Sequence, residues 1–125
     1  MITEDYVSFE TAKLLKEKGF DWECLGTYST GDKELSISSE CPYSNDLNDD
    51  MFIAAPTLQM GMKWLREDHH IHILPQISDP SQVNPKYYIV IWTTGTKRES
   101  YILELFNSYE EAVEEGIKYC LEDLI

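Results

Sequence analysis

The spacing of apolar residues along the chain predicts three helices and five strands. The first helix is expected over residues 6–19, where Ser8 can cap its start and Gly19 can end it in the left-handed conformation. The last helix has the clearest pattern. Its apolar residues recur at helical spacing over 109–124, after an S-x-x-E capping box that starts at Ser108. Both helices have one apolar face, so each is expected to cover another element.

A stretch near the middle of the chain, residues 54–77, is typical of a helix that runs directly into a strand. Pro56 suits the first helical position, and apolar residues then follow at helical spacing as far as Leu65. From Ile71 the apolar period changes to two, which indicates a strand. Pro75 favours an edge position for this strand or the end of its pairing, because proline cannot donate a ladder hydrogen bond.

The other strands are expected as two antiparallel hairpins. The first hairpin covers residues 22–38 around a glycine-containing turn. The second joins the apolar run 86–94 to the strand 100–106, and the run 86–94 has apolar residues on both faces, as an interior strand does. Residues 39–53 and 78–86 are rich in turn-forming residues and are expected to be loops.

These elements follow one another in the order α, β-β, α, β, β-β, α. Short turns between paired strands indicate antiparallel neighbours. The sequence therefore predicts an α+β fold with two layers, in which about three helices cover one face of a mainly antiparallel five-stranded sheet. A chain of 125 residues fits a single domain over residues 1–125.

The chain is strongly acidic, with 23 Asp and Glu against 10 Lys and Arg and a net charge of −13. This charge disfavours direct binding to nucleic acid and to anionic membranes. Its simplest interpretation is solubility through self-repulsion, although an acidic face could also bind a basic protein. No apolar run approaches about 18 residues, so no membrane span is expected. Three widely spaced cysteines without an export signal indicate a cytoplasmic protein with reduced thiols.

The central helix carries an apolar pair outside its main apolar stripe. Met60 and Trp64 are four residues apart, so they are expected to stack on each other. One interpretation is that the loop 39–53 or a sheet edge covers this pair. The other is that the pair binds a protein partner or a second copy of the chain, since Trp and Met are enriched at interfaces. The acidic face of the last helix is the other candidate for binding a protein.

The three histidines His69, His70 and His72 cluster where the central helix meets its strand. On a strand, His70 and His72 would face the same way and could share a metal ion with a further Cys or acidic ligand. The ordinary alternative is that these imidazoles satisfy helix-end carbonyls and line a polar strand face. The common catalytic and nucleotide-binding motifs do not occur in the chain, so no catalytic residue and no cofactor is expected.

The predicted helices include segments that read YVSFETAKLLKEKGF, APTLQMGMKWLRE and SYEEAVEEGIKY. In these segments the chain resembles a group of small proteins encoded in gut Bacteroidetes genomes, often in phage or mobile-element regions. An alanine is usual in that group where this chain has Gly61, which slightly weakens the helix here. The group has no assigned activity, so the resemblance assigns no site residues. It implies a cytoplasmic, phage-linked accessory role in preference to a metabolic one.

These features together predict a non-enzymatic, acidic protein-interaction module of the cytoplasm, associated with a phage. Its partner is expected to be a protein or a second copy, bound through Met60 and Trp64 or through the acidic face of the last helix. Two alternatives stay open. The first is an inhibitor that mimics nucleic acid and binds a DNA-binding protein. The second is a small metal-binding protein that uses His70 and His72.

Overall fold

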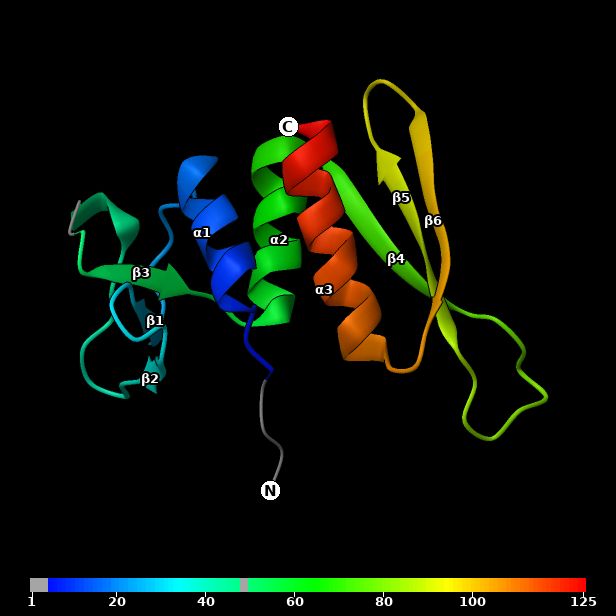
Figure 1. Cartoon of the computed structure of the whole chain (residues 1–125). Coiled ribbons are helices and arrows are strands. Elements are labelled where there is room, and N and C mark those ends of the chain that lie inside the picture. Colours follow the sequence, from blue (N-terminus) through cyan, green and yellow to red (C-terminus); the bar gives the residue numbers. More distant parts are fainter. Residues whose placement is uncertain (1–4, 48–49) are drawn as a thin grey trace. The chain divides into compact units, whose positions relative to one another are not determined.

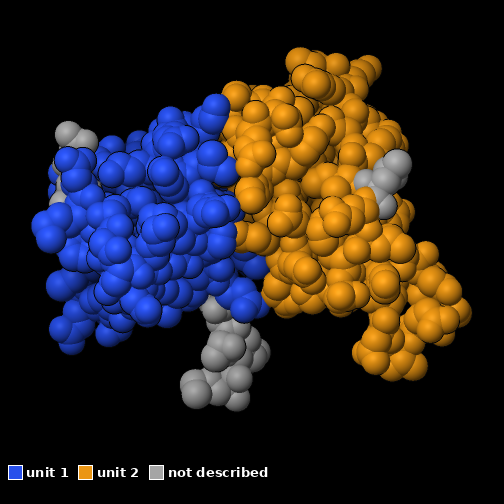
Figure 2. Space-filling view, viewed as in Figure 1, with its two compact units in different colours: residues 1–61 blue, residues 62–125 orange. Residues whose placement is uncertain are grey.

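The structure is a computed structural model that describes residues 5–47 and 50–125. Within these residues the chain forms three α-helices and two antiparallel sheets (Figure 1). The chain divides into two compact units, residues 1–61 and 62–125 (Figure 2). Helix α2 (Leu58–His69) begins in the first unit and ends in the second. The predicted α+β class is confirmed, whereas the single-domain organisation stays a prediction.

The first unit contains a sheet with the strand order β2-β1-β3. Strands β1 (Gly26–Ser29) and β2 (Leu35–Ile37) form the antiparallel hairpin that the sequence predicts. Strand β3 (Phe52–Ala55) pairs antiparallel with the other edge of β1. The sequence instead predicts the end of a loop and the start of a helix there, because four residues are too few to show a strand period. Its pairing with β1 is what makes this segment a strand.

Helix α1 (Phe9–Glu17) packs against β3 in the first unit. The Ser8 hydroxyl accepts a hydrogen bond from the backbone N–H of Thr11 at 3.3 Å, so Ser8 is the cap that the sequence predicts. After the helix, Gly19 has a φ of +93°, the left-handed conformation that glycine adopts at little cost. Both predicted ends of this helix are therefore confirmed.

The second unit contains a sheet with the strand order β4-β5-β6 (Figure 1). Strands β4 (Ile71–Ile77), β5 (Tyr87–Thr93) and β6 (Arg98–Phe106) follow one another as antiparallel neighbours. Helix α3 (Tyr109–Tyr119) contacts all three strands and lies along one face of this sheet. The edge position predicted for β4 and the interior position predicted for β5 are both confirmed.

The core of the second unit lies between α3 and the sheet. Ile73, Ile89 and Ile91 alternate along β4 and β5 and are at most 5% exposed. Gly116 allows α3 to approach these strands closely, since a Cβ atom there would lie 3.2 Å from Cγ2 of Ile73. An alanine at this position would therefore require the Ile73 side chain to shift by a few tenths of an ångström.

The predicted single five-stranded sheet is wrong, because the strands belong to two three-stranded sheets. Strand β3 completes a separate sheet with the first hairpin, and β4, β5 and β6 pair only among themselves within the described residues. An apolar period shows which face of a strand is buried, but it does not show which strand lies beside it. Helix α1 packs with the sheet of the first unit, and helix α3 packs with the sheet of the second.

The start of α2 also differs from the prediction. The helix begins at Leu58, two residues after Pro56, which was expected at the first helical position. The hydroxyl of Thr57 accepts a hydrogen bond from the backbone N–H of Met60 at 3.2 Å. Threonine therefore satisfies a free donor at the helix start. The carbonyl of Pro56 instead accepts a hydrogen bond from the backbone N–H of Val7 at 3.1 Å.

Candidate functional site

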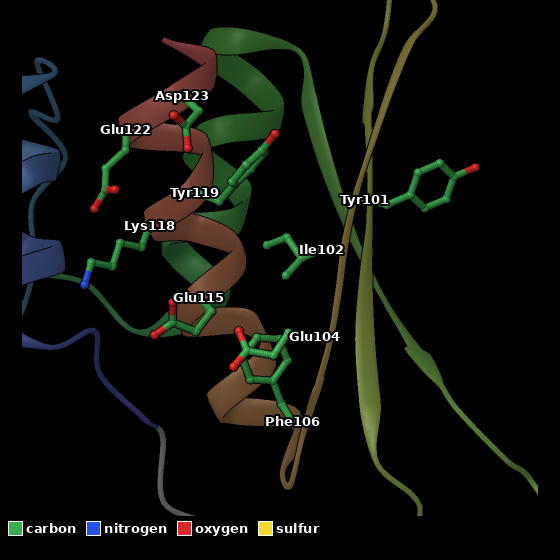
Figure 3. Close-up of a pocket in the computed structure, with 9 residues that line it drawn as sticks. All are labelled: Tyr101, Ile102, Glu104, Phe106, Glu115, Lys118, Tyr119, Glu122 and Asp123. Carbon is green, nitrogen blue, oxygen red and sulfur yellow. The ribbon is translucent and has the colours of Figure 1, made fainter.

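A groove of about 460 Å³ lies between strand β6 and the C-terminal part of the last helix (Figure 3). From the strand, Ile102, Glu104 and Phe106 point toward the helix. From the helix, Tyr119 points back toward the strand. The other lining residues are Tyr101 of the strand and four residues of the helix, Glu115, Lys118, Glu122 and Asp123.

The groove combines an apolar floor with an acidic rim. Phe106 is buried, and Ile102 and Tyr119 are half-buried. Figure 3 shows Lys118 and Glu122 extending from the helix away from β6, so they lie at the outer rim. Four exposed carboxylates surround the floor, and they belong to Glu104, Glu115, Glu122 and Asp123. With one lysine among four carboxylates, the groove attracts positively charged groups.

Two irregularities of the backbone meet at this groove. From Arg98 to Ile102, each residue of β6 pairs with one residue of β5. Phe106 pairs with Tyr87 and Ile102 with Ile89, so the register of the ladder shifts between these two pairs, as it does at a β-bulge or a similar irregularity. On the other side, α3 passes into the π-helical segment Cys120–Leu124, which carries two of the carboxylates. Bulges and π-helical turns are uncommon and are enriched at functional sites, so their meeting here favours the groove.

The face of the second sheet opposite α3 carries exposed apolar side chains. Leu74 pairs with Val90, which in turn pairs with Tyr101, so these three residues form a row across the sheet. Leu74, Tyr101 and the neighbouring Trp92 are 42%, 50% and 38% exposed. Adjacent large apolar side chains on a surface often mark interaction sites. Since Tyr101 also lines the groove, strand β6 connects the groove to this apolar face.

Of Met60 and Trp64, the structure buries the tryptophan and leaves the methionine half-buried. Trp64 is only 1% exposed, and its ring lies edge-on to the His69 ring with 4.7 Å between the centroids. Met60 is half-buried, and its Sδ lies 3.7 Å from Sγ of Cys24. A helical wheel gives the direction of a side chain but not the elements that cover it. Trp64 therefore offers no exposed surface to a protein partner or a second copy, and binding through Met60 stays a prediction.

His70 and His72 do not share a strand face, contrary to the prediction. Strand β4 begins at Ile71, and His70 before it has a φ of +59°, which ends helix α2 in the left-handed conformation. The carbonyl of His70 accepts a hydrogen bond from the backbone N–H of Thr94 at 2.9 Å. His72 lies half-buried on β4. Nowhere in the described part of the chain do three His, Cys, Asp or Glu side chains gather to hold a metal ion, so metal binding stays a prediction.

The sequence indicated part of the groove and missed the rest. It marked the acidic face of the last helix, and Glu115 and Glu122 from that face do line the groove. It offered no reason to choose Glu104 on β6. The alternation along a strand puts Ile102 on one face of the sheet, but it does not show that the C-terminal helix lies opposite.

The three cysteines are free thiols in different environments. Cys24 and Cys120 are buried, and burial raises the pKa of each thiol to about 12. Cys41 is exposed. Since the thiolate is the reactive form, the two buried thiols are expected to be inert in the folded protein.

We expect a thiol reagent at mildly alkaline pH to modify Cys41 quickly, and Cys24 and Cys120 only after unfolding. The buried thiols also make stability depend on pH. The pKa of each thiol in the folded protein exceeds the unfolded value of 9.0. Their contribution to the stability of the folded protein is therefore complete below pH 9.0 and is lost as the pH rises toward about 12. Mass spectrometry of the labelled protein with and without urea measures the reactivity, and urea melts across this range measure the stability. Equal labelling of all three thiols in the folded protein would contradict this expectation.

No protein-family model matches the chain, and no curated protein or solved structure matches it either. Residue roles therefore come only from the geometry of the chain itself. Across the residues that the structure describes, no helix is long and apolar enough to cross a membrane.

Proposed function

We propose that this protein is a non-enzymatic interaction module that binds a partner protein in the groove between β6 and the C-terminal helix. The observation that carries the proposal is the meeting of a register shift in β6 and a π-helical segment at a groove with an apolar floor and an acidic rim. The backbone departs from regular structure on both sides of the same groove, in β6 and at the end of the last helix. Such local departures from regular structure are expected where a protein has a function to serve.

The composition of the groove suits a protein interface. Interfaces combine a buried aromatic centre with a polar, exposed rim. Here Phe106 and Tyr119 supply the aromatic centre, and the exposed carboxylates supply the rim. The apolar face beside Tyr101 extends the available surface beyond the groove.

The charge of the groove favours a partner with a basic surface. Complementary charges speed association and suppress wrong partners, whereas like charges repel. A second copy of the chain carries the same net charge of −13, so this groove favours a different protein over self-association. The cytoplasmic location and the phage-linked accessory role remain parts of the proposal that come from the sequence.

Capture of the partner with matched charge variants tests the proposed function. The groove variant is Glu104→Lys with Asp123→Lys. The control is Glu67→Lys with Asp68→Lys, which changes the same residue types at exposed positions of α2 outside the groove. We expect the native protein and the control to retain the same basic partner from a host lysate, and the groove variant to lose it. Circular dichroism confirms that both variants are folded.

Two results would count against the proposal. The first is a partner that the groove variant retains as well as the control does, and the second is a lysate in which nothing binds the native protein specifically. Added DNA separates the mimicry alternative, because a DNA-binding partner is displaced by DNA. Release of the partner by DNA would assign the acidic surface to mimicry of nucleic acid.

A further inference from the structure

Strand β6 presents an open sheet edge along the groove. In the order β4-β5-β6, only β5 pairs with β6 among the described residues. The strand has nine residues and is the longest in the described chain. An unpaired edge of this length exposes backbone donors and acceptors that an added strand can satisfy.

The other sheet edges are less suited to accept a strand. Strand β4 forms the opposite edge of the same sheet, but Pro75 in its middle has no N–H to donate. In the first unit, the edge strands β2 and β3 have only three and four residues. Strand β6 contains no proline and keeps a constant register over residues 98–102, so it is the best edge for strand addition.

A strand added to β6 would have two different environments for its side chains. Successive side chains of a strand point to opposite faces of the sheet. On the face toward α3 they would enter the groove, where Glu104 and Asp123 favour positive charge. On the opposite face they would lie next to Tyr101, which Figure 3 shows pointing away from the helix, and there apolar contact is favoured.

We propose that β6 accepts an extended partner segment as a fourth strand, and that lysine or arginine alternates with apolar residues along this segment. The inference rests on the proposed function, because it names the partner of the same groove. Basic side chains meet the carboxylates of the groove, and the apolar residues between them pack on the face beside Tyr101. Backbone hydrogen bonds to the edge of β6 hold the segment in register.

Synthetic peptides of three designs, each as long as β6, nine residues, test this inference. The first alternates lysine with valine. The second alternates glutamate with valine, so only the charge is reversed. The third is the lysine peptide with N-methyl groups on alternate amides, which keeps the charge and removes strand hydrogen bonds along one edge; both methylation registers are made. Binding is followed by nuclear magnetic resonance titration of the whole chain with its amides labelled.

We expect the lysine peptide to bind and to shift the amide signals of residues 98–102 and of Glu104. The glutamate peptide should not bind, and at least one N-methylated register should bind more weakly by about tenfold or more. The groove variant Glu104→Lys with Asp123→Lys should bind the lysine peptide with an affinity lower by at least about tenfold. The control Glu67→Lys with Asp68→Lys should lower this affinity by less than about twofold. Added salt should weaken the binding further.

Several outcomes overturn the inference. Undiminished binding of both N-methylated peptides means that charge alone attracts the peptide, and binding of the glutamate peptide means that charge does not select it. Shifts along β4 instead of β6 place the added strand elsewhere. If no peptide binds while capture of the partner still depends on the groove, strand addition is wrong and the proposed function stands. If capture shows no dependence on the groove, the proposed function itself fails.

Discussion

Replacement of Trp64 by alanine is expected to destabilise the fold by about 3 to 5 kcal/mol. The side chain of Trp64 is 1% exposed and is among the largest fully buried side chains of the protein. Its removal loses buried apolar surface and leaves a cavity that rigid surroundings fill only in part. An exposed interface residue would behave differently, because truncation of a surface side chain usually changes stability by less than about 0.5 kcal/mol.

Urea denaturation followed by far-ultraviolet circular dichroism measures this difference directly. Lys63→Ala is the matched control, since Lys63 is the exposed residue next to Trp64 in the same helix. We expect the free energy of unfolding of the control to lie within about 0.5 kcal/mol of that of the native protein. If Trp64→Ala were as stable as the control, the burial of the Trp64 ring would be contradicted. Trp64 would then again be a candidate contact for a partner protein.

Substitution of Gly26 by alanine is expected to destabilise the protein by about 1 to 3 kcal/mol, although it adds only one methyl group. A Cβ atom at Gly26 would lie 2.8 Å from the carbonyl oxygen of Ala55 and 2.9 Å from Cε2 of Tyr6. Gly26 pairs with Ala55 in the ladder between β1 and β3, so the carbonyl belongs to the backbone of a paired strand. That carbonyl cannot move away without distorting the ladder, and the strain falls on the sheet of the first unit.

Gly116→Ala in α3 is the informative comparison for Gly26→Ala. A Cβ atom at Gly116 would lie 3.2 Å from Cγ2 of Ile73, and the methyl group of a side chain can shift by a few tenths of an ångström. Alanine also gains up to about 1 kcal/mol of helix propensity over glycine, which offsets the tighter contact. We expect Gly116→Ala to change stability by less than about 1 kcal/mol in the same urea melts. Equal effects of the two substitutions would contradict the distinction between a backbone and a side-chain obstacle.

Strand β6 is where the two proposals meet. Its face toward the helix carries Glu104 and Phe106 into the groove, and its other face carries Tyr101 into the exposed apolar surface. A partner that added a strand here would use both faces and the edge at once. Charge, apolar contact and backbone hydrogen bonding would then each contribute to selection of the partner.

The sequence by itself determined the local structure of the chain. The Ser8 cap and the Gly19 stop of α1 were both predictable, and so was the Ser108 cap of α3, whose hydroxyl accepts from the backbone N–H of Glu111 at 3.1 Å. These features depend on residues three or four positions apart, so the local sequence contains the information. The alternation along β5 likewise predicted the two faces of that strand.

Only the tertiary structure decided which elements meet. It paired β3 with β1 and divided the strands between two sheets. It buried Trp64, for which the helical wheel had left both burial and a partner contact open, and it set Glu104 opposite the C-terminal helix. The physical reason is the same in each case. The free energy of these arrangements comes from surfaces that are far apart in the chain and become neighbours only on folding, and no local period of apolar residues records that distance.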